Sequence, residues 1–259
     1  MRDMPPVSSH DVLRTVYVGT QEVRVTTTEL YPCTARGNTG TGAALATCDR
    51  AIVLHPHPKL GGSRFDHVTM ALGSALARGG VLCVLPELGG MGWSWRGTNE
   101  LAVVEALIRD QLAAMAQPAQ LFVVGYSFGA ALALAGGGRV LANDATARSR
   151  IRGLVAVSYP AGWAARLLLG WLRVPELLHV DLQDTSLCVV AGHQDSFASE
   201  EDTQALVNWL ETNSSCTTNG RVRHIWEPDA DHFWVQCADL AADHVVQFVN
   251  DCRDTTGRS

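Results

Sequence analysis

The chain has 259 residues, of which 47% are hydrophobic and 18% charged, and its formal net charge is −6. This length is sufficient to bury the core of one domain, and α/β sheets of this size often stay undivided. The negative balance, with no Lys/Arg-rich run, excludes an electrostatic basis for binding nucleic acid or an anionic membrane.

The seven cysteines are scattered, and none lies in a Cys-x-x-Cys pair. Reduced thiols therefore fit better than a disulfide framework or a zinc knuckle. The first residues contain no apolar signal segment, and no apolar run is long enough to span a bilayer. We therefore expect a cytoplasmic protein.

Two β-branched segments open the chain, Val12–Val18 and Glu22–Thr28, and Gly19 separates them. This arrangement predicts an antiparallel hairpin. Residues 34–47 follow, rich in Gly, Thr and Ala and without periodicity, and we expect a mobile loop there.

Short apolar runs then alternate with segments of helical periodicity. The runs that we predict as strands are Ala51–Leu54, Val81–Leu85, Leu121–Val124, Leu154–Val157, Leu187–Val190 and Val222–Trp226. The predicted helices cover Val68–Ala77, Leu101–Leu112, a stretch from about Ala130, Ala205–Leu210 and Cys237–Val249. This order predicts a mostly parallel sheet covered by helices on both faces, with the hairpin at one edge. We interpret residues 1–259 as a single α/β domain, in which residues 159–180 form a crossover helix with a short lid.

A candidate nucleophile, Ser127, lies in Gly125-Tyr-Ser-Phe-Gly129, between a predicted strand and a predicted helix. Small residues two positions either side of the serine permit a sharp strand-to-helix turn that exposes the hydroxyl. The amide of Phe128, at the start of the helix, would face developing negative charge. The alternative is a Gly-rich turn with an inert serine.

A serine nucleophile needs a base and an acid that orients the base, and in this architecture the chain order is serine, acid, histidine. Asp195 follows one predicted strand and His232 follows the next. Because the carboxyl ends of parallel strands meet at one edge of the sheet, Ser127, Asp195 and His232 are the predicted catalytic triad.

Other carboxylates and histidines fit these roles less well. Asp181 and Asp184 precede their strand, whereas Asp202 belongs to the next helix, where a carboxylate caps the first turn. Asp231 is interpreted as a surface or supporting residue. His193 is interpreted as a solvated histidine of the loop that carries Asp195, with a site-lining role as the alternative. His224, within a predicted strand, and His244, within a predicted helix, are interpreted as structural.

The loop His55-Pro-His-Pro-Lys-Leu-Gly-Gly62 directly follows the first of these predicted strands, Ala51–Leu54. In this architecture such a loop supplies the second oxyanion donor. Proline has no N–H, so the amide of His57 is the best candidate, with Lys59 or Leu60 as alternatives. A His-x-His metal site would need a following Asp-His pair, which this chain lacks, so no metal or other cofactor is expected.

The His-Pro-His-Pro-x-x-Gly-Gly run, Gly-Tyr-Ser-Phe-Gly and Asp231-His-Phe together resemble the α/β-hydrolases, in particular the small dienelactone-hydrolase-like group. The loop Glu87–Ser94 matches that group only loosely, because Leu88 occupies its arginine position. The resemblance implies an α/β-hydrolase fold without a large cap domain, the triad above, and an oxyanion hole built from the Phe128 and His57 amides.

These features predict a serine hydrolase that cleaves a carboxylic ester or thioester through an acyl-enzyme. With few charged residues near the site, we expect a small or apolar acyl substrate. The alternatives are an acyl-peptide hydrolase or peptidase with the same triad, and a non-catalytic binding protein. Four tryptophans either line the acyl pocket or belong to ordinary core, and these are Trp93, Trp163, Trp171 and Trp234.

Overall fold

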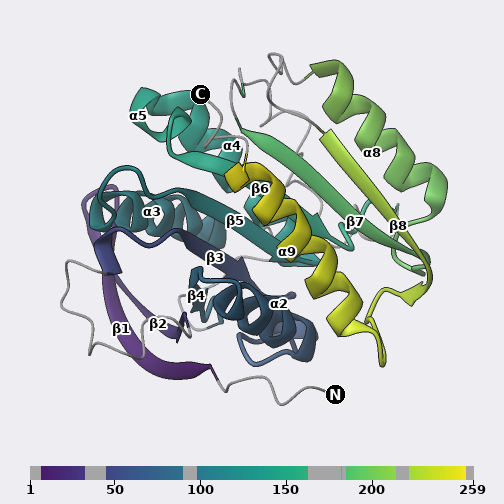
Figure 1. Cartoon of the computed structure of the whole chain (residues 1–259), viewed down its shortest axis with the longest axis horizontal. Helices are drawn as coiled ribbons and strands as arrows, with labels where there is room; N and C mark the ends of the chain where they lie inside the picture. The colour runs from purple at the N-terminus through teal and green to yellow at the C-terminus, as the bar shows by residue number, and fades with distance from the viewer. Residues whose placement is uncertain are drawn as a thin grey trace.

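The computed structural model describes residues 7–32, 45–89, 98–162, 182, 185–213 and 222–254. Within them lies an eight-stranded sheet with the order β1-β2-β4-β3-β5-β6-β7-β8 (Figure 1). Its strands are β1 (Ser8–Val18), β2 (Gln21–Tyr31), β3 (Arg50–Leu54), β4 (Leu82–Pro86), β5 (Leu121–Tyr126), β6 (Ile151–Val157), β7 (Ser186–Gln194) and β8 (Val222–Asp231). Strand β2 is antiparallel to β1 and β4, and the other neighbours are parallel. The predicted mostly parallel sheet with an antiparallel hairpin at one edge is confirmed.

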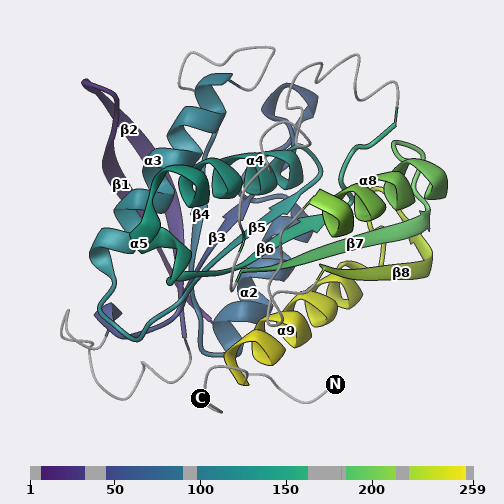
Figure 2. The same ribbon diagram turned by 90° about the horizontal axis from the view of Figure 1, so that it is seen from above.

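Helices cover both faces of this sheet. They are α2 (His67–Arg78), α3 (Thr98–Ala114), α4 (Phe128–Asn143), α5 (Ala145–Arg148), α8 (Glu200–Asn213) and α9 (Ala238–Asp254), with a short 3₁₀ turn over Pro58–Leu60. Figure 2 shows α2 and α9 on one face and α3, α4 and α8 on the other. Among the described residues, no helix is both long and apolar enough to cross a membrane.

The central strands are apolar on both sides because each side faces a layer of helices. Leu121 and Val123 of β5 belong to the core cluster beneath α3 and α4, whereas Phe122 and Val124 belong to the cluster beneath α2 and α9. All four side chains are fully buried. Burial of each contributes roughly 1.5–3 kcal/mol, so the sheet anchors both cores.

The last two strands continue past Val190 and Trp226, where the sequence predicts that they end. The register between the two strands shifts at a bulge between Gly192 and Gln194. Glycine is required there, because a Cβ at Gly192 would lie 2.1 Å from the carbonyl oxygen of Ala230 in β8. Beyond the bulge Gln194 pairs with Asp231. The next residue of each strand therefore leaves the sheet beside its counterpart.

Two predicted segments fall mostly outside the described residues. Of the loop predicted over 34–47, only 45–47 are described, and Leu45 and Ala46 are helical. Of the lid predicted over 159–180, only 159–162 are described. The mobile loop and the lid therefore stay predictions.

The turn from β5 into α4 requires glycine at two positions. A Cβ on Gly125 would lie 2.0 Å from the carbonyl oxygen of Gly129, and a Cβ on Gly129 would lie 2.3 Å from that of Leu54. Because these are backbone atoms, no side-chain adjustment relieves either contact. The tight turn also lets α4 begin at Phe128, earlier than the predicted start near Ala130.

We predict that Gly125→Ala lowers the free energy of unfolding by more than about 3 kcal/mol, because its Cβ overlaps fixed backbone. Gly19→Ala is the control, since Gly19 has a positive φ of 61° but nothing within 4 Å of the added Cβ. It should cost only about 1 kcal/mol. Urea unfolding measures both, and equal losses would contradict the steric argument.

Arg64 ties the loop after β3 to the edge hairpin. Its Nε donates to Thr28 Oγ1 at 2.9 Å, and its guanidinium reaches Asp11 Oδ2 at 3.3 Å and Glu87 Oε2 at 3.4 Å. Residue 64 therefore joins β1, β2 and the segment after β4. This network fixes the loop that begins at His55.

Glu87 is the half-buried carboxylate in this network. Burial opposes its ionisation, but the His55 imidazole, 3.3 Å away, and the amides of Gly89 and Arg64 lower its pKa to about 2. The folded protein therefore favours the ionised form more strongly than the unfolded chain does.

Because the folded-state pKa of Glu87 lies below its ordinary value of 4.5, the ionised carboxylate stabilises the fold above about pH 4.5. This contribution is lost as the pH falls toward 2. We predict that Glu87→Gln destabilises the protein at pH 6 by up to about 3 kcal/mol and that the difference shrinks below pH 4. Urea unfolding across this range measures it, with exposed Glu22→Gln as a control for removing one carboxylate. A constant deficit at every pH would contradict the prediction.

Candidate active site

Ser127 occupies the turn between β5 and α4, in a strained backbone conformation that persists only where surrounding contacts hold it. Its φ is 56° and its ψ is −120°, outside the usual regions for a residue with a side chain. The Ser127 amide donates to the Val157 carbonyl of β6 at 2.9 Å. Together with the two glycine contacts, this bond holds the serine at the end of the helix axis.

His232 directly follows β8 and reaches the serine. The distance from Ser127 Oγ to His232 Nε2 is 2.9 Å, and the imidazole is almost entirely buried. Tyr126 Oη donates to the His232 carbonyl oxygen at 2.9 Å, which fixes the backbone that carries the ring. Burial raises the pKa of Tyr126, and the carboxylates of Asp66, Asp195 and Asp231 raise it further, so this phenol stays a donor.

Asp195 directly follows β7 and holds the other side of the imidazole. Its Oδ2 and Oδ1 lie 2.8 Å and 3.0 Å from His232 Nδ1. Oδ1 also accepts from the amides of Phe197 at 2.8 Å and Ala198 at 3.2 Å. A carboxylate only accepts, so Nδ1 carries the proton and Nε2 is free to accept from Ser127. The sequence-predicted serine, histidine and aspartate thus form one hydrogen-bonded chain.

The competing carboxylates lie elsewhere. Asp202 lies in the first turn of α8, where its Oδ2 accepts from Ser199 Oγ at 2.9 Å. Ser199 Oγ is the group that caps this turn, because it accepts from the Asp202 amide at 3.1 Å. Asp231 Oδ1 accepts from the Val235 amide at 3.2 Å, a supporting role. Asp181 and Asp184 lie outside the described residues.

The other histidines are not part of this chain. His193 belongs to β7 and not to the predicted loop, because the strand continues past the bulge. The ring centroid of the exposed His193 lies 4.8 Å from that of Trp226, and the ring centroid of His224 lies 4.7 Å from the same tryptophan. His244 of α9 approaches Glu227 at 3.2 Å. These contacts join the three histidines to Trp226 and Glu227 and not to the triad.

The loop after β3 brings the His57 side chain against Phe128. Their ring centroids are 4.6 Å apart, and α4 rests on the Leu54 and His55 carbonyls through Gly129. Burial lowers the pKa of His57, and the nearby Lys59 and His55 lower it further. The two predicted oxyanion donors therefore belong to neighbouring segments.

The hydrogen bonds of the loop distinguish its amides. Leu60 N–H donates to the His57 carbonyl at 3.0 Å, and Lys59 N–H donates to His57 Nδ1 at 3.2 Å. Both alternative donors are thus engaged. In the described part of the chain, the amides of His57 and Phe128 have no partner of this kind. These two amides therefore stay the predicted oxyanion donors.

The glycines and the first histidine of this loop have steric and polar reasons. Gly61 has a φ of 88°, and a Cβ on Gly62 would lie 2.4 Å from the Pro56 carbonyl oxygen. That oxygen also lies 2.6 Å from the buried His55 Nδ1. Because a carbonyl and the following amide share one plane, fixing Pro56 O also orients the His57 N–H.

Of the four tryptophans, only Trp234 is described. It is fully buried within the core cluster beneath α2 and α9, and its Nε1 donates to Ser158 Oγ at 2.9 Å. This corrects the expectation that Trp234 lines a substrate pocket and favours ordinary core. The other three, Trp93, Trp163 and Trp171, lie outside the described residues.

Two aromatic residues that the sequence reasoning missed contact the imidazole. The Phe197 ring centroid lies 4.4 Å from that of His232, and the Phe233 centroid lies 5.4 Å from it. Their positions, just after the acid and just after the base, were the available signal. Neighbours in sequence of triad residues are obliged to lie near the site.

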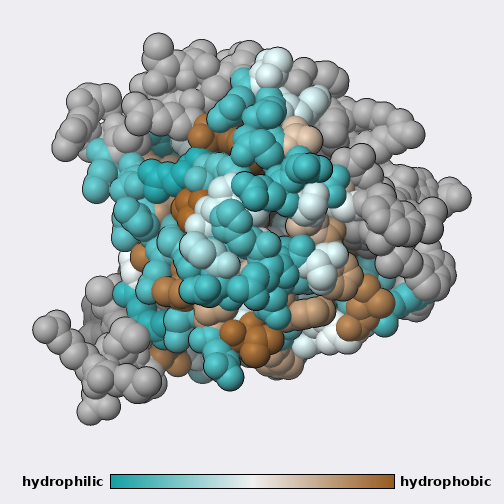
Figure 3. Space-filling view, turned by 90° about the vertical axis from the view of Figure 1, so that its right-hand side faces the viewer, coloured by the Kyte–Doolittle hydropathy of each residue, from teal (hydrophilic) through white to brown (hydrophobic). Residues whose placement is uncertain are grey.

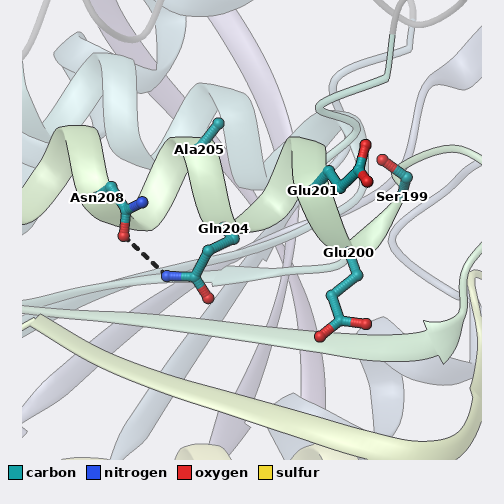
Figure 4. Close-up of a pocket in the computed structure, with 6 residues that line it drawn as sticks. All are labelled: Ser199, Glu200, Glu201, Gln204, Ala205 and Asn208. Carbon is teal, nitrogen blue, oxygen red and sulfur yellow. Dashed lines mark hydrogen bonds between the residues drawn. The ribbon is translucent and has the colours of Figure 1, made fainter.

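A hollow of about 810 Å³ lies along the first turns of α8 (Figure 4). Its described lining residues are polar apart from Ala205, and Gln204 Nε2 donates to Asn208 Oδ1 along the helix at 2.8 Å. None of the three triad residues is among the described residues that line this hollow. Among the described residues there is also no cluster of three or more His, Cys, Asp or Glu that could hold a metal ion.

The fold of this chain is similar to the folds of several solved proteins. The chain resembles a solved alpha-beta serine hydrolase homologue from Coxiella burnetii, with 19% identity and a TM-score of 0.65 over 92% of this chain and 96% of that one. It also resembles a serine hydrolase without lid from Xanthomonas campestris, with 20% identity and a TM-score of 0.59 over 92% of each chain.

A third similar structure is an esterase from Pyrococcus furiosus, with 16% identity and a TM-score of 0.66 over 96% of this chain and 93% of that one. At these identities the likeness establishes the α/β-hydrolase fold. A search of the curated proteins finds no match. The narrower resemblance to the dienelactone-hydrolase-like group stays a prediction. Residues 51–252 match the model of the Alpha/beta hydrolase family, and the chain therefore belongs to that family.

Proposed function

We propose that this protein is a serine hydrolase that cleaves a carboxylic ester or thioester through an acyl-enzyme. The observation that supports this proposal is the continuous hydrogen-bonded chain from Ser127 through His232 to Asp195. Each member is positioned by backbone contacts of its own, so the chain exists before substrate arrives.

In the proposed reaction, Ser127 Oγ attacks the carbonyl carbon while His232 Nε2 takes its proton. Asp195 keeps the imidazole in the required tautomer and stabilises its charged form. The His57 and Phe128 amides stabilise the oxyanion. His232 then gives the proton to the leaving oxygen or sulfur, and water attacks the acyl-enzyme by the same steps to release the acid.

The same triad also suits an acyl-peptide hydrolase or peptidase, and a non-catalytic protein could retain the fold. We favour ester or thioester substrates because the described side chains that pack beside the imidazole, Phe197 and Phe233, are apolar. Trp93, Trp163 and Trp171 stay a prediction for the acyl pocket. The substrate is proposed as a small molecule.

A fluorophosphonate probe tests the nucleophile, because it forms a covalent bond only with an activated serine. We predict stoichiometric labelling of the intact protein and none of Ser127→Ala. Exposed Ser196→Ala is the matched control, since it also removes a hydroxyl beside the triad, and it should label as the parent does. Mass spectrometry measures the adduct. No labelling of the folded parent would favour the non-catalytic alternative.

The oxyanion donor is tested by removing one N–H. His57 has a φ of −63°, which is the value that proline imposes, so His57→Pro deletes the amide hydrogen at little conformational cost. We predict that this variant loses roughly 10²–10³-fold in kcat on an aryl ester, with a smaller change in KM.

His57→Ala controls for the lost side chain, because it keeps the amide while removing the ring contact with Phe128. Its kcat should stay within about tenfold of the parent value. If the alanine and proline variants lose activity equally, the side chain matters and the amide assignment is wrong.

A further inference from the structure

Proton return fixes where a leaving group must lie. His232 Nε2 takes the proton from Ser127 Oγ, 2.9 Å away, and the same nitrogen then protonates the departing oxygen or sulfur. The leaving group therefore lies within hydrogen-bond reach of that edge of the imidazole. A side chain that flanks the imidazole on that edge therefore also flanks the leaving group.

Two phenylalanines flank this imidazole and each other. Phe197 packs against the ring at 4.4 Å with planes 36° apart, and Phe233 meets it edge-on at 5.4 Å and 87°. The two phenyl rings lie 5.8 Å apart at 88°. The three rings form one contiguous aromatic group.

Part of this aromatic group faces solvent. Phe233 is 50% exposed and Phe197 is partly exposed, whereas His232 is buried. The two phenylalanines follow the carboxyl ends of the parallel strands β7 and β8. Figure 3 shows the side of the molecule on which these strands end, where hydrophobic residues lie between hydrophilic ones. Exposed aromatic surface beside a reacting atom is surface that an apolar ligand group can cover.

The backbone around both rings is fixed. The Phe197 amide donates to Asp195 Oδ1 at 2.8 Å, and its carbonyl accepts from the Gly162 amide at 3.0 Å. The Phe233 carbonyl lies 2.8 Å from His67 Nε2 at the start of α2. The aromatic surface is therefore preformed, and little ordering is needed when a ligand covers it.

We propose that Phe233, supported by Phe197, forms the leaving-group subsite and selects esters or thioesters whose alcohol or thiol part is aromatic or otherwise apolar. This inference rests on the proposed hydrolase function and adds specificity on the leaving-group side. It makes no demand on the acyl chain, which is a different substituent of the tetrahedral carbon.

Two acetate esters test it, benzyl acetate and methyl acetate, because they share the acyl-enzyme and differ only in the leaving group. We expect Phe233→Ala to lower kcat/KM for benzyl acetate about tenfold more than for methyl acetate. Phe233→Leu, which keeps apolar surface, should recover most of the difference. The ratio between methyl butyrate and methyl acetate should not change.

Tyr17→Ala is the matched control, because it removes a 65% exposed aromatic ring from β1, at the opposite edge of the sheet. It should leave the benzyl-to-methyl ratio unchanged. Equal losses on both acetates in Phe233→Ala, or a change confined to the acyl series, would overturn the subsite. A parent protein that neither reacts with fluorophosphonate nor cleaves any ester would instead overturn the hydrolase function itself.

Discussion

The site depends on a backbone contact that leaves no room for a Cβ. Strand β5 turns into α4 so tightly that Gly125 meets the Gly129 carbonyl, while Gly129 rests on the end of β3. This contact forces Ser127 into its positive φ and brings the His55–Gly62 loop beside the first turn of the helix. One steric constraint thus positions the proposed nucleophile and both proposed amide donors together.

The proposed acid and base, Asp195 and His232, depend on a different constraint, the register of the last two strands. Because Gln194 pairs with Asp231 beyond the bulge, the next residues, Asp195 and His232, leave the sheet as neighbours. Their hydrogen bonds then need only short side chains. The parallel sheet places both strand ends at one edge, and the bulge sets the register that makes Asp195 and His232 neighbours.

The sequence predicts the alternation of strands and helices, the edge hairpin and the order of the triad, since periodicity and motif spacing are local properties. It places the ends of β7 and β8 too early, because Gly192 and its polar neighbours have the composition of a loop. It cannot distinguish the buried Trp234 from a pocket tryptophan, because both environments favour large apolar side chains. Burial is set by distant segments that no local pattern encodes.

The same reasoning explains why chemistry is easier to predict here than specificity. Proton transfer requires particular atoms at hydrogen-bond distance, and few combinations of residue types supply them. An apolar subsite requires only surface of suitable shape, which Phe, Trp or Leu could all provide from many positions. Phe197 and Phe233 become candidates only once their rings are found against His232. In the proposed reaction, selectivity on the leaving-group side therefore follows from contacts with the His232 imidazole. A substitution at Phe233 would change the preferred alcohol while the proton path stays intact.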